Sequence, residues 1–459
     1  MVYSSLLFIY GFLPLSLLFY CIAPQKRQPL ILFIFSMIYC GMFSFSFLVF
    51  IIAYVLINYA GCRLTEKQRN AEKCSILPYA FCVIFDTAAI FFFRSEFFEP
   101  IRRALGAAAD FFPVGISFFT LSALGTLTDV YRGRIAAEKN IISFGLYIMM
   151  FPRLIMGPVL RYSSFSRILK ERKVGLCEIG KGITLFVKGL VKKVIFADSL
   201  YMLYTAVRGT EVTELSALTA WLGAVAYILC LYFTLSSFSD MAAGLGLCFG
   251  LKFPKSFNYP MFSTKIRYFY ARWQTQVVKW FRKNFTHPLS SISRNRIYRK
   301  AVFIAAWGVF GFWYTFNING FVWGILLGTA IVLEKRFSHA KMLNITGAIY
   351  TFFTVIFAFV ILFGDDLFYS AKYLLAMIGG NNNFADALSL YLIKCYSVIL
   401  LICMYASTDL FKNIRIRLEK TKLHLAFEAI SPIVILFLLM ACTALMSFDG
   451  SSGTMLIIF

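Results

Sequence analysis

Long apolar runs, separated by short polar or basic stretches, extend along almost the whole chain. A run of about 20 apolar residues is long enough to cross a bilayer as a helix. The pattern therefore predicts an all-α polytopic membrane protein with roughly 11–13 membrane segments. The apolar runs lie near 5–23, 29–47, 48–61, 76–93, 141–157, 183–200, 215–235, 302–316, 318–333, 346–364, 387–406 and 427–447.

Composition supports the membrane class. Hydrophobic residues make up 60% of the chain, charged residues 15%, and the mean hydropathy is +0.75. A soluble domain would carry about a quarter charged residues. The polar stretches are too short to bury a core of their own, so we expect a single polytopic membrane domain over residues 1–459. The 11 cysteines form no Cys-x-x-Cys pair and have no histidine nearby, so we expect packing roles and no metal site.

Positive charge is concentrated in a few loops. The net charge is +23, and the segment 251–300 contains twelve Lys and Arg residues but no Asp or Glu. Lys and Arg near the ends of spans mark the cytoplasmic side. These loops are therefore expected to face the cytoplasm, with membrane lipids as partners through their anionic headgroups. Smaller basic loops lie at 63–73, 167–173, 335–341 and 412–422.

Aromatic residues alternate with basic ones in the segment 251–300. Helical spacing would gather Phe269, Trp273 and Trp280 on one side. This pattern predicts a basic helix that lies in the membrane interface. A basic stripe is also found in nucleic-acid-binding proteins, but the apolar composition argues against that class, and we expect no nucleic-acid partner.

Several short motifs occur in a fixed order along the chain. They are Pro113–Phe119, Asp129–Gly133, Phe151–Pro158, Gly189–Asp198, Ser239–Gly246, Phe257–Pro260, Arg272–Gln274 and Phe312–Thr315. This ordered set resembles the membrane-bound O-acyltransferase family, in its alginate O-acetyltransferase-like branch, from about Phe111 to about Gly380. The resemblance implies helices around a central tunnel. It also implies transfer of an acyl group, often acetyl, from a cytosolic donor to a cell-envelope or exported polysaccharide.

Both histidines of the family pattern are replaced. In the family a His follows the Arg-Trp pair and a second His lies in a Trp-His-Gly block, and here these positions are Gln274 and Tyr314. Acyl transfer to a hydroxyl needs a general base, for which His is suited. Glutamine cannot take up a proton, and an ordinary phenol, with a reference pKa of about 10, is almost entirely neutral at pH 7. We therefore expect both catalytic positions to be inactive. His287, the only histidine in this region, matches no catalytic position of the family.

The remaining candidate residues would shape a cavity or bind a ligand. They are Asp240, Asn258, Tyr259, Arg272, Trp273 and Trp313. An acidic residue inside an apolar segment is costly and usually lines a cavity or pairs with a base. Asp240 is therefore expected either to orient groups in the central cavity or to form a structural salt bridge.

Three functions remain open. The chain is a degenerate, non-catalytic member that acts as a partner or regulator, an active acyltransferase that uses replacement residues, or a conduit or transporter. The resemblance implies no tightly bound cofactor, and an anionic donor (acyl-CoA or an acylated carrier protein) that would bind at the basic cytoplasmic face. It also implies an extracytoplasmic acyltransferase or a polysaccharide-export partner. The expected location is the bacterial cytoplasmic membrane, with several passes.

Overall fold

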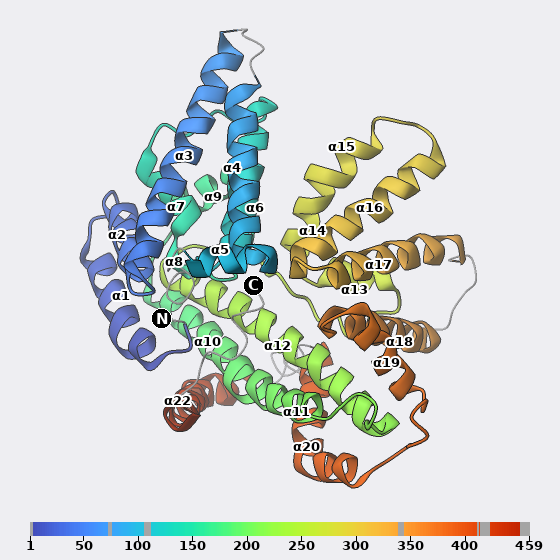
Figure 1. The fold of residues 1–459 in the computed structure, drawn as a ribbon. Coiled ribbons are helices and arrows are strands. Elements are labelled where there is room, and N and C mark those ends of the chain that lie inside the picture. Colours follow the sequence, from blue (N-terminus) through green and yellow to red (C-terminus); the bar gives the residue numbers. More distant parts are fainter. Residues whose placement is uncertain are drawn as a thin grey trace. The chain divides into compact units, whose positions relative to one another are not determined.

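The computed structural model describes residues 3–71, 76–104, 112–337, 344–410, 413 and 423–449 (Figure 1). In these ranges every regular element is a helix, which confirms the predicted all-α class. The chain forms two compact units, of which the first contains Met1–Phe186 and Phe238–Lys255 and the second Val187–Ser237 and Ser256–Ile458. The helices α10 (Leu176–Val191) and α12 (Ala217–Cys248) contribute residues to both.

The first unit contains the helices of the amino-terminal part of the chain. In order these are the π-helix η1 (Phe8–Phe12), α1 (Leu13–Ile22), α2 (Gln28–Gly41), α3 (Phe45–Asn70), α4 (Leu77–Arg94), the 3-10 helix η2 (Glu96–Phe98), α5 (Glu99–Ala104), α6 (Ile116–Tyr131), α7 (Ile141–Met149), α8 (Phe151–Leu154) and α9 (Tyr162–Lys170).

The second unit contains longer helices in its carboxy-terminal half. In order these are the π-helix η3 (Lys192–Ala197), α11 (Asp198–Arg208), α13 (Ile266–Arg272), α14 (Thr275–Phe281), the π-helix η4 (Arg282–Thr286), α15 (His287–Ser290), α16 (Arg296–Thr315), α17 (Ile318–Phe337), α18 (Asn344–Phe363), α19 (Leu367–Met377), α20 (Ala387–Ala406) and α22 (Leu423–Asp449).

Polar caps determine where several of these helices begin. The Ser44 side chain accepts a hydrogen bond from the backbone N–H of Phe47 at the start of α3. Asn140 caps α7 in the same manner. At the start of α20, Asp386 and Ser389 form a reciprocal capping box. Each cap satisfies backbone N–H groups that have no partner within the helix.

Seven helices in the described part of the chain are long and apolar enough to cross a membrane. The candidate spans are Phe45–Asn70, Leu77–Arg94, Ala217–Cys248, Ile318–Lys335, Thr346–Phe363, Ala387–Ala406 and Ala429–Ser447. Two shorter apolar helical stretches, Phe8–Ile22 and Gln28–Gly41, precede them. The chain is thus a multi-pass membrane protein. Of the further predicted segments, α7 has only 9 residues, and α10 and α16 carry basic residues.

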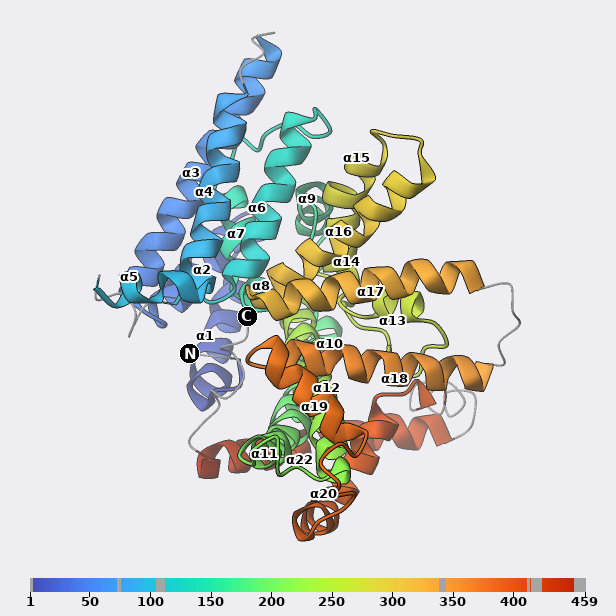
Figure 2. The same cartoon turned by 45° about the vertical axis from the view of Figure 1, so that its right-hand side comes forward.

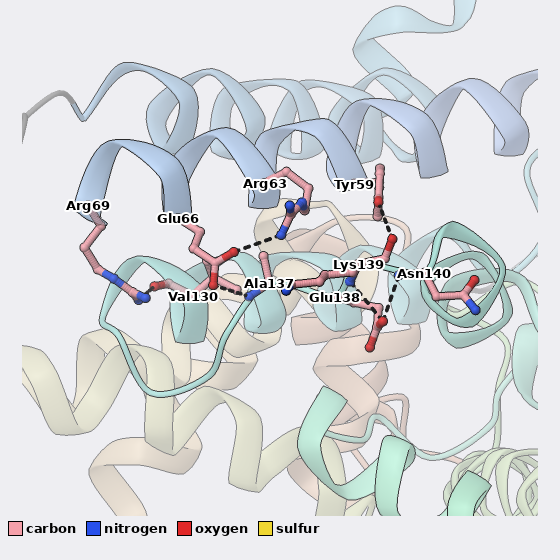
Figure 3. Close-up of polar contacts among 9 residues, drawn as sticks. All are labelled: Tyr59, Arg63, Glu66, Arg69, Val130, Ala137, Glu138, Lys139 and Asn140. Atoms are coloured by element: carbon pink, nitrogen blue, oxygen red, sulfur yellow. Dashed lines mark hydrogen bonds and ion pairs between the residues drawn. The ribbon is translucent and has the colours of Figure 1, made fainter. Parts of the chain in front are cut away.

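The helices α3, α4 and α6 pack against one another in the first unit (Figures 1 and 2). At one end, α3 is fastened to the stretch between α6 and α7 (Figure 3). Glu66 pairs with Arg63 at 3.0 Å and accepts a hydrogen bond from the backbone N–H of Ala137 at 3.0 Å. The Tyr59 hydroxyl donates to the carbonyl oxygen of Lys139 at 2.7 Å. The basic residues of these two segments therefore lie at the same end of the unit.

The helices α16 and α17 form a tightly packed hairpin in the second unit. A side chain at Gly311 would collide with the carbonyl oxygen of Gly320, and one at Gly324 would collide with that of Trp307. Glycine at these positions lets the two backbones approach closely. α18 in turn packs along α17 (Figures 1 and 2).

The segment 251–300 is not the single helix that its spacing suggested, and its location in the membrane interface remains a prediction. It consists of short helices, and the chain breaks sharply at Gln274, whose backbone is left-handed with φ 40° and ψ 51°. Phe269 and Trp273 are both buried. The prediction of a single domain over 1–459 remains a prediction.

Candidate functional site

The break between α13 and α14 carries the first of the two replaced histidine positions. α13 ends at Arg272, Trp273 follows in extended conformation, and Gln274 precedes the first residue of α14. Two backbone hydrogen bonds fasten this break to the preceding loop. The N–H of Asn258 donates to the carbonyl of Arg272 at 3.0 Å, and the N–H of Thr275 donates to the carbonyl of Ser256 at 2.8 Å.

Trp273 anchors the break in an aromatic core. Its side chain is fully buried. Its ring stacks on Phe269 with centroids 5.4 Å apart and meets Phe257 edge-on at 5.4 Å. Phe359 of α18 lies at 5.6 Å. Aromatic pairs at these separations contribute beyond their buried area, so this packing holds the peptide of Gln274 in place.

Tyr314, at the second histidine position, lies next to this anchor. It is 1% exposed near the end of α16, and its ring packs on Trp323 of α17 at 5.6 Å. Its hydroxyl faces the indole N–H of Trp273. The structure therefore brings the two replaced positions to the same part of the second unit, with Trp273 linking them.

The chemistry of this cluster is neutral. Gln274 is 4% exposed, and its Oε1 has no hydrogen-bond partner in the described part of the chain. An amide cannot act as a general base. The Tyr314 hydroxyl lies in an aromatic environment, where a phenolate would lose its hydration without a compensating positive charge. The arrangement supports packing and hydrogen bonding, and neither Gln274 nor a neutral Tyr314 is a proton acceptor of the strength of an imidazole.

The other predicted site residues are more dispersed. Trp313 is 7% exposed, and its ring stacks on Phe310 at 6.2 Å. Arg272 and Asn258 are exposed, and Tyr259 is half-buried with a left-handed backbone at φ 48°. Asp240, half-buried on α12, belongs to the first unit, whereas all the others belong to the second. Their joint role in a cavity remains a prediction.

Two features of this region were not predicted from the sequence. Tyr270 is 1% exposed, and its hydroxyl has no hydrogen-bond partner among the described residues. A cavity of about 620 Å³ lies between α12, α18 and α20 and is lined almost entirely by apolar side chains. Phe269 lines this cavity and also stacks on Trp273, so one ring separates the cavity from the buried cluster.

The helices α17 and α18 give the second unit two distinct ends. The backbone N–H of Ile266 donates to the carboxylate of Glu334 at 2.8 Å, so the start of α13 lies at the end of α17. α18 begins shortly afterwards and, with 20 residues, rises about 30 Å to the opposite end. There Arg208 of α11 pairs with Asp365 at 2.5 Å.

Charge differs between these ends. Lys265 and Arg267 flank Ile266 at the first end, and the basic stretch 335–341 follows α17. The loops 209–216, 364–366 and 378–386 contain no Lys or Arg. Lys and Arg near the ends of spans are typical of the cytoplasmic side, and the first end is the more basic of the two. In the described part of the chain, no group of three or more His, Cys, Asp or Glu side chains is placed to hold a metal ion.

Comparison with known proteins identifies relatives over most of the chain, although no family profile matches it. The chain is 30% identical over 405 residues to the probable alginate O-acetylase AlgI of Pseudomonas syringae pv. tomato, covering 84% of this chain and 76% of that protein. It is 31% identical over 389 residues to the probable alginate O-acetylase AlgI of Pseudomonas aeruginosa, covering 80% and 73%. It is 26% identical over 433 residues to the peptidoglycan O-acetyltransferase of Helicobacter pylori, covering 83% and 80%. The chain therefore belongs to the membrane-bound O-acyltransferase family, among its alginate O-acetylase-like members.

Proposed function

We propose that this protein takes part in O-acetylation of a cell-envelope or exported polysaccharide as a non-catalytic partner or regulator. The membership in the alginate O-acetylase-like group supports the process. The observation that carries the non-catalytic role is the pair of replacements, Gln274 and Tyr314, at the two histidine positions of the family. Loss of a general base typically lowers a rate ~10²–10⁴-fold.

The burial of both replacements supports the same role. Gln274 and Tyr314 are both buried, and Tyr314 packs on the ring of Trp323. The surrounding scaffold is nevertheless closely packed, as the backbone approach of α16 and α17 at Gly311 and Gly324 shows. A scaffold that keeps its packing without its base is suited to binding a partner.

The charge of the two ends supports the proposed donor. An acyl-CoA or an acylated carrier is anionic and would bind at the basic cytoplasmic end, where Arg and Lys suit phosphate groups. An extracytoplasmic acyltransferase or a polysaccharide-export protein would bind at the opposite end. The bacterial cytoplasmic membrane is the location that fits both.

An active acyltransferase is the second candidate, and one observation favours it. The hydroxyl groups of Tyr314 and Tyr270 and the indole N–H of Trp273 lie close together in the buried cluster. A polar cluster of this kind could bind an acyl carbonyl. Under this reading Tyr314 itself would be the catalytic phenol. The third candidate, a conduit or transporter, has no specific support in the described residues.

Acetyl transfer by the purified protein separates the first two candidates. The protein in lipid nanodiscs is incubated with radiolabelled acetyl-CoA and a hydroxyl-bearing polysaccharide, and both donor hydrolysis and acceptor labelling are measured. We expect both to stay at background. Turnover above background that disappears in Tyr314→Phe, but persists in the matched variant Tyr270→Phe, would replace the non-catalytic role with a catalytic one.

Genetic complementation tests the role in the process. Deletion of the chain should lower O-acetylation of the envelope polysaccharide, and the wild type and Tyr314→Phe should restore it equally. A deletion that leaves acetylation unchanged would contradict any part in this process. Loss of complementation in Tyr314→Phe, with normal protein levels, would again favour catalysis.

The orientation is tested with two exposed positions of the second unit. In a cysteine-free background, Lys279→Cys lies in the basic segment and Thr213→Cys in a loop at the opposite end. An impermeant thiol reagent applied outside intact cells should label Thr213→Cys and leave Lys279→Cys unlabelled. The reverse pattern would invert the proposed topology.

A further inference from the structure

Arg153, in the first unit, is a buried cation without an acidic partner. It lies on the short helix α8 and is 5% exposed. Its Nη2 donates to the hydroxyl of Ser122 on α6 at 3.0 Å. The guanidinium carbon lies 4.8 Å from the ring centroid of Tyr147 and 5.6 Å from that of Phe165. Two aromatic rings and the hydroxyl groups of Ser122 and Tyr147 therefore surround the guanidinium group.

The second terminal nitrogen of Arg153 is not satisfied. Nη1 is buried and has no hydrogen-bond partner among the described residues. A cavity of about 10 Å³ adjoins Arg153 and is bounded by Phe119, Ser122, Gly157 and Pro158. A cavity of this size holds one particle about as large as a water molecule. Arg153 therefore lines a small space and has one terminal nitrogen without a hydrogen-bond partner among the described residues.

No described carboxylate neutralises this charge. The nearest acidic residue along α6 is Asp129, which lies two turns beyond Ser122 and pairs with Arg134 at 3.2 Å. Two helical turns correspond to about 11 Å. An isolated buried charge is costly unless it is paired, and cation–π contact with two rings offsets only part of that cost.

We infer that the cavity beside Arg153 is a binding site for a small monovalent anion, chloride in the cell. A halide ion accepts a hydrogen bond from Nη1 and neutralises the buried guanidinium, and it has no donor groups of its own that need acceptors. A water molecule would also accept from Nη1, but it would leave the charge uncompensated and would itself need two to four polar partners. Larger anions such as acetate or phosphate exceed the space.

The bound anion would stabilise a specific part of the first unit. Arg153 accepts a backbone hydrogen bond at its carbonyl from Gly157 N–H at 2.9 Å, so the residue is connected to the turn that leads from α8 towards α9. An ion between Nη1 and this turn would hold α6, α8 and the turn together. The inference does not depend on the proposed function.

Thermal unfolding of the full chain in nanodiscs tests the site. The Tm is measured in sodium chloride, sodium bromide and sodium gluconate at equal ionic strength. We expect the wild type to unfold about 2–4 °C or more higher in the halide salts, with saturation as halide concentration rises. Arg153→Met, which keeps the aliphatic shape, should lose this difference. Arg134→Met, which removes a half-exposed arginine, should retain it.

Equal Tm values of the wild type in halide and gluconate, or an unchanged difference in Arg153→Met, would overturn the inference in favour of a bound water. Should Arg153→Met not fold, crystals of the wild type soaked in bromide decide the question. An anomalous peak beside Nη1 is expected. Its absence at saturating bromide, with only water density in the cavity, would also overturn the inference.

Discussion

The interior of the first unit contains ionisable side chains, whereas the surroundings of Tyr314 in the second unit are neutral. Asp86 and Arg153 are buried in the first unit, each held by neutral groups: Asp86 accepts from the amide of Asn58 at 2.9 Å, and Arg153 lies between two aromatic rings. Around Tyr314 the buried polar atoms belong to the amide of Gln274, to three indoles (Trp273, Trp313 and Trp323) and to two phenols (Tyr270 and Tyr314).

The two regions differ in the kind of side chain that they bury. The chain is able to bury an ionisable group where hydrogen bonds or ring faces support it, as at Asp86. At the two positions where the family has histidine, it instead buries side chains that neither take up nor release a proton near neutral pH. The neutrality of that cluster is thus a local property of Gln274 and Tyr314, and the following changes test it.

The largest expected effect comes from supplying a base. The double variant Gln274→His with Tyr314→His places imidazoles at both family positions. If the rest of the site is intact, acetyl transfer should rise ~10²–10⁴-fold above that of the wild type, the usual contribution of general-base catalysis. The measurement is acceptor labelling from acetyl-CoA in nanodiscs.

The matched control is Gln274→His with Tyr314→Phe, which carries only one imidazole and should gain less. A double-histidine variant that folds normally and transfers nothing would show that more than the base has been lost. The region around Tyr314 would then differ from an active site in its geometry as well as in its lack of a base.

The next effect concerns the packing that holds the neutral cluster. Trp273→Ala removes a fully buried ring that contacts Phe269, Phe257 and Phe359. Truncation of a buried tryptophan typically lowers the free energy of unfolding by about 3–5 kcal/mol. Unfolding in denaturant measures this loss, and Trp280→Ala, at a half-buried position, is the control with a smaller expected loss. Equal losses of unfolding free energy in both variants would contradict the anchoring role of Trp273.

The sequence predicts the membrane class because each apolar run is continuous in the sequence and can be recognised without knowledge of the tertiary structure. Phe45–Asn70 and Ala387–Ala406, for example, are helices where apolar runs predicted them. The two replaced histidine positions can also be recognised from the sequence, because each lies within a short motif whose neighbouring residues identify it. The helical spacing assumed for Phe269, Trp273 and Trp280 does not hold, because the backbone of Gln274 is left-handed and a glutamine in the sequence does not indicate such a conformation.

The buried charges of the first unit cannot be predicted from the pattern of apolar and polar residues. Arg153 is 31 residues from Ser122 and 12 from Phe165, and only the packing of α6, α8 and α9 brings them together. Asp86 likewise meets Asn58 across two helices. Such contacts depend on how helices pack, which hydropathy does not determine.

A moderate loss of stability is expected when Asp86, a buried acid of the first unit, is replaced. Asp86→Ala removes the acceptor of the Asn58 amide and leaves that donor buried without this partner, which should cost about 1–3 kcal/mol of stability. Asp86→Asn keeps an acceptor oxygen of the same shape and should cost less. Thermal unfolding of the two variants side by side provides the test. Equal losses would mean that the acid, and not merely its oxygen, is required, which would widen the difference between the two regions.

The smallest expected effects compare the two buried phenols of the second unit. Tyr314→Phe removes the hydroxyl that faces the indole N–H of Trp273, and loss of one such interaction typically costs about 0.5–1.5 kcal/mol. Tyr270→Phe removes a hydroxyl that has no hydrogen-bond partner among the described residues, so it should be neutral or slightly stabilising, since an unsatisfied polar group leaves the interior. Both rings keep their packing, so the difference in Tm isolates the hydroxyl. A larger loss in Tyr270→Phe than in Tyr314→Phe would mean that Tyr270 holds a partner in the membrane-embedded protein, and the neutral cluster would then be centred on Tyr270.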